Sequence, residues 1–192
     1  MDYFKKIIFI LLLIFNFSIA NASTSEFIGV IGAAIGEIKN QKEEVLINGS
    51  KIYYGDTIIV GQQSNAQILF LDQTVITVGE KSELTIDEFI YDPDTNDGKF
   101  VSNIKSGTVK IITGEISKKN PDNLEIKIPT GTIGARGTEF VVLAESSKES
   151  TVVLLGPGPK NTLGMIAGNL EVSDGINSVN IIQPGFETVV SN

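Results

Sequence analysis

The chain has 192 residues, a formal net charge of −8 at pH 7 and 42% hydrophobic residues, and it contains no histidine, cysteine or tryptophan. These absences exclude serine–histidine and cysteine–histidine catalysis, disulfides, and metal sites built on imidazole or thiolate. The acidic balance, with no basic patch interleaved with aromatic residues, argues against a nucleic-acid partner.

The first 22 residues have the pattern of a secretory signal peptide. Lys5 and Lys6 precede an apolar run over residues 7–19, and Ala20-Asn-Ala22 supplies a small-x-small cleavage pattern. A bilayer span needs about 20 apolar residues, so the run is short for the alternative, an uncleaved anchor. We predict cleavage after Ala22, which would leave residues 23–192 as a single domain with 13 basic and 22 acidic groups, a net charge of −9.

The remainder predicts an all-β domain without a helix, because short apolar runs alternate with glycine, asparagine, aspartate and proline turns. The predicted strands include Ala66–Leu71, Thr74–Val78, Thr108–Ile112, Leu124–Ile128, Ser150–Leu155, Leu170–Val172 and Val179–Ile182. A glycine precedes a β run at residues 55, 107 and 168, which favours strands stacked as coils of a twisted β-solenoid or β-roll. The alternative is an ordinary all-β protein with many glycine turns.

The segment Asp92-Pro-Asp-Thr-Asn-Asp-Gly98 is rich in oxygen ligands. Its candidate calcium ligands are Asp92, Asp94, Asn96 and Asp97. Glycine stands at the seventh position rather than the sixth, so the segment departs from the EF-hand pattern. A solvated turn between strands is the preferred interpretation, and a calcium site is the alternative.

Arg136 is the only arginine in the chain, and the motif around it comprises Gly134, Arg136, Gly137 and Thr138. A guanidinium can satisfy several oxygens in one fixed geometry, which an ammonium cannot. We expect the side chain to turn inward at the corner before the strand 138–143 and to bind backbone oxygens. The alternative is a recognition residue for an acidic partner or glycan.

Four segments together resemble the FecR-like domain family, named for the regulator of iron-dicitrate transport. They are Tyr54–Asp72 with Thr74–Ile86, Glu88–Thr95 running on to Gly107–Lys110 and Thr113–Pro121, Thr132-Ile-Gly-Ala-Arg-Gly-Thr138, and Gln183-Pro-Gly185. The resemblance implies a twisted β-solenoid-like domain outside the cytoplasm. Better-known members of that family are regulators that carry signals from outer-membrane siderophore receptors. In those regulators a cytoplasmic anti-sigma segment and one membrane span precede the domain, and this chain is expected to have neither.

One hairpin departs from the family pattern. The family often has Asp-Gly after its long strand, whereas this chain has Asp72-Gln73. Glutamine resists the positive φ of a type I′ turn, so we predict a longer corner or one of another type.

Paired carboxylates do not indicate an enzyme. The pairs Asp87-Glu88 and Glu43-Glu44 are adjacent in sequence, and neighbours on a strand point to opposite faces. A glycosidase needs two carboxyl groups facing one sugar, and a chain without tryptophan has little to stack on one. We therefore expect no enzyme, no catalytic residues and no cofactor.

The predicted function is an exported binding or scaffold module in the periplasm or at the cell surface of a Gram-negative bacterium, with another envelope protein as partner and no membrane span after signal cleavage. The first alternative is a sensor in envelope signalling that acts in trans, and the second is an envelope glycan hydrolase. Unpaired strands at the two ends of the sheet would recruit the partner. The candidate end pieces are Phe27–Ile38 and Phe186–Val190. At least one of them is expected to be covered by a loop or paired with another chain.

Overall fold

A computed structural model describes residues 26–160, 165 and 167–191 of the chain. The predicted signal peptide lies outside this part. The described residues form an all-β fold, as predicted, with fifteen strands, one short helix and one 3₁₀ turn. The strands are β1 Phe27–Ile35, β2 Ile38–Asn40, β3 Lys51–Tyr53, β4 Thr57–Val60, β5 Asn65–Phe70, β6 Val75–Val78, β7 Glu83–Asp92, β8 Asp97–Ile112, β9 Leu124–Ile128, β10 Gly131–Arg136, β11 Glu139–Ser146, β12 Glu149–Gly156, β13 Asn169–Ser173, β14 Ser178–Ile181 and β15 Glu187–Ser191.

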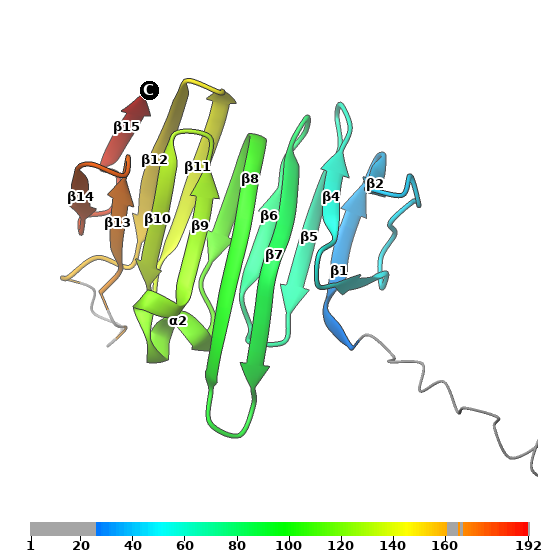
Figure 1. Ribbon diagram of the computed structural model, residues 1–192, viewed down its shortest axis with the longest axis horizontal. Helices are drawn as coiled ribbons and strands as arrows, with labels where there is room; N and C mark the ends of the chain where they lie inside the picture. Colours follow the sequence, from blue (N-terminus) through cyan, green and yellow to red (C-terminus); the bar gives the residue numbers. More distant parts are fainter. Residues whose placement is uncertain (1–25, 161–164, 166, 192) are drawn as a thin grey trace, which may run out of the picture.

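Hydrogen bonds join all these strands into one open network that folds into two layers through β8 (Figure 1). The first half of β8 pairs with β7 and β9, and its second half pairs with β6 and β11. The first layer therefore runs β3-β1-β5-β6-β8-β11-β12-β15, and the second runs β2-β4-β7-β8-β9-β10-β13-β14. Every pairing is antiparallel except that of β8 with β9.

Gly107 allows one 16-residue strand to serve both layers. Its φ of 88° is a conformation that side chains with a Cβ rarely adopt. A Cβ at this position would collide with Ser82, whose hydroxyl accepts a hydrogen bond from the Thr108 N–H at 3.0 Å. The pairing of β8 changes from β7 to β11 beside this glycine. Gly107 is therefore a bend inside a strand and not, as the sequence suggested, a turn before one.

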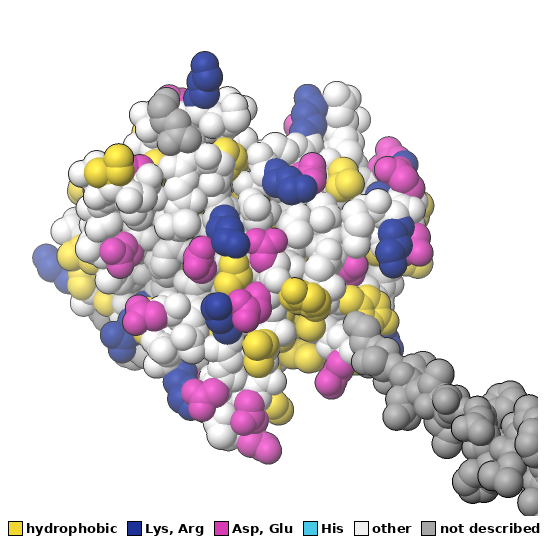
Figure 2. Space-filling model, viewed as in Figure 1, with side chains coloured by type: hydrophobic (Ala, Val, Ile, Leu, Met, Phe, Trp, Pro, Cys, Tyr) yellow, Lys and Arg dark blue, Asp and Glu magenta, His cyan; other side chains and the backbone are white. Residues whose placement is uncertain are grey.

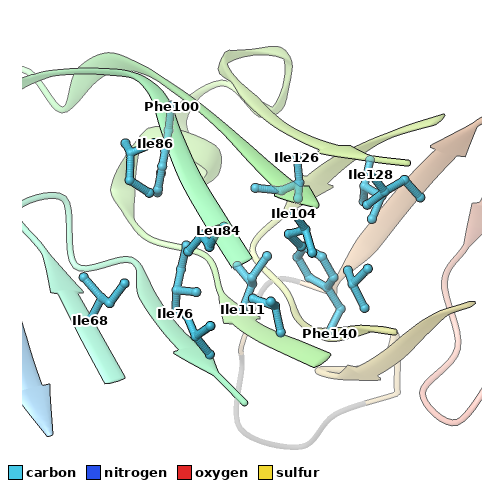
Figure 3. Close-up of a cluster of buried hydrophobic side chains, with 14 of the residues drawn as sticks. Ile68, Ile76, Leu84, Ile86, Phe100, Ile104, Ile111, Ile126, Ile128 and Phe140 are labelled. Atoms are coloured by element: carbon cyan, nitrogen blue, oxygen red, sulfur yellow. The ribbon is translucent and has the colours of Figure 1, made fainter. Parts of the chain in front are cut away.

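The core lies between the two layers, where alternate apolar residues of each strand point inward (Figure 3). Phe100 on β8 is fully buried, and its ring centroid lies 4.8 Å from that of Phe70 on β5 in the opposite layer. Phe89 on β7 completes the aromatic cluster at 5.3 Å from Phe100. Phe70 also stacks on Phe89 at 5.7 Å, so its ring joins the first layer to the second.

The expectation of stacked solenoid coils is not confirmed. Neighbouring strands in a coil stack are typically parallel, whereas here hairpins dominate and a single pairing is parallel. The strands instead form one open mixed sheet that is folded into two layers. Its tight corners contain glycine, as expected, but they connect antiparallel neighbours.

The expectation that the domain has no helix is wrong at one place. Glu115–Lys119 forms α2, and Pro121–Asn123 forms the 3₁₀ turn η1 that leads into β9. The Asn120 side chain caps η1 by accepting a hydrogen bond from the Asp122 N–H at 3.2 Å. Within the described residues, neither helical segment has the length and apolar character needed to cross a membrane.

The β5–β6 corner has glutamine at the position where the resemblance implies glycine. The Phe70 N–H donates to the Thr74 carbonyl at 2.9 Å, which leaves three residues in the loop. Gln73 takes a φ of 69°, as the last residue of a three-residue hairpin loop requires. The corner is longer than a two-residue turn, as predicted, but glutamine itself adopts the positive φ that it was expected to avoid.

Candidate interaction site

The acidic segment 92–98 forms the hairpin between β7 and β8, and two of its three carboxylates, those of Asp92 and Asp97, are engaged in local contacts. The Asp92 carboxylate accepts a hydrogen bond from the Thr95 hydroxyl at 2.8 Å, and this bond lowers the pKa of Asp92. Asp97 pairs with Lys119 of α2 at 2.8 Å, which lowers the pKa of Asp97. In the described part of the chain, no group of three or more acidic residues is placed to hold a metal ion. The four candidate ligands therefore form a hydrogen-bonded turn.

Arg136 does not point inward as predicted. It is the last residue of β10, it is exposed, and its side chain forms no hydrogen bond or ion pair with another described residue. The buried residue of this motif is Thr138, whose hydroxyl donates to the Gly156 carbonyl at 3.0 Å. The Thr138 N–H donates to the Thr113 hydroxyl at 2.9 Å. The corner is therefore held by a threonine that joins the ends of β8, β11 and β12.

A shallow polar groove of about 500 Å³ lies over the outer face of β9, β10 and β13. Gly134 forms its floor, since no described atom lies within 4 Å of the position that a Cβ would occupy. Glu125 and Glu171 flank this glycine on the two neighbouring strands, and Arg136 lies at one end. Two strand spacings separate the glutamate backbones, about 10 Å. In glycosidases the two carboxyl groups themselves lie about 5–5.5 Å apart in retaining enzymes and about 6.5–9.5 Å apart in inverting ones, so the spacing of the strands alone does not decide whether these glutamates could act as a pair.

The groove has no aromatic side chain among its described lining residues on which a sugar ring could stack. Its glutamates stand on an open sheet surface, exposed or half-buried. The arrangement can bind a polar ligand, and it lacks the enclosed geometry that carboxylate catalysis uses.

At the N-terminal end of the sandwich, the end strand β2 is covered by its own chain, whereas β3, the other end strand, pairs only with β1. The loop 41–50 folds over β2: the Asn40 N–H donates to the Glu44 carbonyl at 3.0 Å, and the Leu46 N–H donates to the Ile38 carbonyl at 2.8 Å. The Leu46 side chain is buried in the core. The candidate end piece at residues 27–38 is thus corrected, since β1 lies between β3 and β5, and the end strand β2 is capped by a loop.

The C-terminal end is open. The strand β14 pairs only with β13, and β15 pairs only with β12, so no strand of the described chain lies along the outer edge of either (Figure 1). A groove of about 240 Å³ between the two edges is lined by Val179, Ile182 and Phe186, which are 50%, 50% and 61% exposed. The prediction that residues 186–190 form an end strand agrees with β15. The role of β14 as the second end strand was missed.

A second apolar groove, of about 520 Å³, lies where β1 begins. Tyr54, Leu71 and Ile90 are exposed along it, and apolar side chains gather in this region of the surface in Figure 2. Of the strands around it, β1 lies between two strands and β7 lies between β4 and β8. The end strand β3 has only three residues, and the Tyr53 N–H and carbonyl bond to the carboxylate and the N–H of Asp56. The C-terminal end is therefore the surface that combines exposed apolar side chains with unpaired backbone.

The profile of the family described as FecR protein matches residues 56–156, just over half of the chain. Among curated proteins, none matches the sequence.

Two crystal structures of a candidate anti-sigma factor from Parabacteroides distasonis ATCC 8503, at 1.65 and 2.50 Å, are similar to the fold, each with a TM-score of 0.51. Their sequences are 14% and 13% identical to this one. The similarity covers 71% of this chain and 55% of theirs, so this chain spans about half the length of those proteins. At such low identity the likeness concerns the fold alone.

Proposed function

The chain belongs to the FecR protein family, and on that premise we propose that it is an exported, non-enzymatic protein-binding module of bacterial envelope signalling. The observation that carries this proposal is the open C-terminal end, where two strand edges and exposed apolar side chains meet. Edges of this kind are normally covered, twisted away or paired, because they otherwise associate with other chains. A permanent partner bound at this end would cover both strand edges.

The chemistry of the side chains supports binding over turnover. The chain has no histidine or cysteine to act as base or nucleophile at neutral pH. The groove over Gly134 places Glu125 and Glu171 about 10 Å apart at the backbone and does not exclude water. If the protein is an envelope glycan hydrolase instead, purified protein will release fragments from cell-wall glycan, and Glu125→Gln or Glu171→Gln will abolish the release. We expect no release from wild type.

Two observations favour signalling over a purely structural scaffold. First, better-known members of the FecR family are regulators. Second, the two solved structures with a similar fold are described as a candidate anti-sigma factor. A scaffold role is the second candidate, because the open end would bind a surface protein equally well. For either role, the signal-peptide pattern supports a location in the periplasm or at the cell surface.

A photo-crosslinking experiment in the cell envelope tests the proposal. A photoreactive phenylalanine analogue replaces Phe186 at the open end, and in a matched control it replaces Ile47, equally exposed in the loop at the covered end. We expect one major crosslinked envelope protein from position 186 and none from position 47. A membrane regulator or receptor supports signalling, and a surface-layer protein or adhesin supports the scaffold. Equal patterns from the two positions would contradict the proposal.

A further inference from the structure

The backbone of β14 has polar groups that no described residue satisfies. In the β13–β14 hairpin the Asp174 N–H donates to the Asn177 carbonyl at 3.2 Å. Hydrogen-bonded and non-hydrogen-bonded pairs alternate along an antiparallel ladder. With the observed register, Val179 and Ile181 bond to β13, whereas Ser178 and Asn180 direct their N–H and C=O groups away from it. The outer edge of β14 therefore offers two donors and two acceptors in the spacing of a strand.

The inner face of β14 is incompletely covered. Val179 pairs with the buried Val172, so its side chain points between the layers, yet it is 50% exposed. On β15 the corresponding inward residue, Val190, is only 7% exposed. An additional strand beside β14 would place alternate apolar side chains over Val179 and opposite Phe186. A strand beside β15 would meet an inward residue that is already covered, so β14 is the better edge.

The charged side chains in the C-terminal part of the chain, which forms this edge, are all acidic. Residues 161–192 contain no lysine or arginine, and they contain Glu171, Asp174 and Glu187. Backbone hydrogen bonds from Asn177 and Ile176 lower the pKa of Asp174, which keeps that carboxylate ionised. The cation nearest in strand order is Arg136 on β10, two strands away from β14. A second copy of this chain would bring another acidic edge, so a basic partner is electrostatically favoured.

We propose that β14 accepts a partner segment in extended conformation, with apolar residues alternating with lysine or arginine, which adds to the second layer as its ninth strand. This inference rests on the proposed protein-binding function and specifies the partner's chemistry. The partner segment pairs with β14 through main-chain hydrogen bonds to Ser178 and Asn180. Its inward-facing apolar side chains cover Val179 at the end of the core. The basic residues lie on the outer face beside Asn180, two strand spacings, about 10 Å, from Glu171 on β13.

Peptide titration tests the proposal with defined probes. Two fluorescein-labelled eight-residue peptides are compared by anisotropy, one alternating lysine with valine and one alternating glutamate with valine. We expect saturable binding of the lysine peptide alone, weakening as salt is added. Equal binding of the two peptides, or binding of neither, would overturn the inference.

Substitutions at Asn180 locate the binding edge. Asn180→Pro removes an outward N–H and no hydrogen bond to β13, so it should abolish peptide binding and leave the melting temperature near that of wild type. Asn180→Lys should weaken binding of the lysine peptide about two- to fivefold, and Asn180→Glu should strengthen it by a similar factor. These two charge variants keep the test decisive if the proline variant does not fold. Unchanged affinity in both would place the peptide elsewhere and overturn the inference.

The crosslinking experiment at Phe186 separates this inference from the proposed function. If position 186 captures an envelope protein while the lysine peptide does not bind, the protein-binding function stands and the basic strand partner is wrong. If position 186 captures nothing and the peptide does not bind, both the protein-binding function and the basic strand partner are contradicted.

Discussion

The sharpest stability prediction concerns two residues of one motif. Thr138 is 3% exposed, and its hydroxyl donates to the Gly156 carbonyl. Thr138→Val keeps the volume and removes the donor, which leaves a buried carbonyl short of one partner at a cost of about 1–3 kcal/mol. For a domain of this size each kcal/mol lowers the melting temperature by roughly 2–4 °C, so the expected decrease is about 2–12 °C.

Arg136→Lys is the matched control. Arg136 is exposed at the end of β10, so its replacement should change the free energy of unfolding by no more than about 0.5 kcal/mol. Thermal melts followed by circular dichroism, with urea titrations for the free energies, measure both variants. A larger loss of unfolding free energy for Arg136→Lys than for Thr138→Val would contradict this prediction. It would indicate that the guanidinium points inward after all.

Three further predictions follow from burial and from the signal pattern. Phe100→Ala, at the aromatic contact between the layers, should cost about 3–5 kcal/mol in the same urea titrations, and a loss below about 1 kcal/mol would contradict the packing. Burial raises the pKa of Asp72 above its ordinary 3.8, so the folded state binds that proton more tightly than the unfolded state. Lowering the pH through the raised pKa towards 3.8 should therefore stabilise wild type relative to Asp72→Asn, and the opposite trend would exclude this cause. N-terminal sequencing of the mature protein should begin at Ser23, whereas recovery of Met1 in a membrane fraction would contradict signal cleavage.

Much of the strand content could be predicted because a strand with one buried face alternates every second residue. Leu124–Ile128 was predicted with the bounds that β9 has, and Ala66–Leu71 differs from β5 by one residue at each end. Alternation determines which side chains share a face, but not which strands become neighbours. The two-layer arrangement depends on the bend at Gly107, and no local pattern distinguishes that glycine from a turn glycine.

The orientation of Arg136 could have been predicted from the same alternation. Ile133 and Ala135 are buried on β10, so Thr132, Gly134 and Arg136 must lie on the outer face. The prediction that Arg136 points inward relied on the flanking glycines and not on the two-residue alternation of the strand.

The open end was partly predictable. Phe186–Val190 was identified as an end strand, but the partner edge at Ser178–Ile181 was not. The available signal was the absence of lysine and arginine after Lys160, because edge strands are commonly protected by such residues. The pairing of β14 with β13 on one side only became visible in the structure.

Amide hydrogen exchange at β14 tests the central claim most directly. The exchange rates of the Ser178 and Asn180 amides are measured for the protein alone and for the protein with the partner captured at position 186. We predict fast exchange of both amides in the free protein and strong protection in the complex, with little change at Val179, which already bonds to β13. Unchanged exchange at Ser178 and Asn180 in a saturated complex would contradict strand addition at this edge.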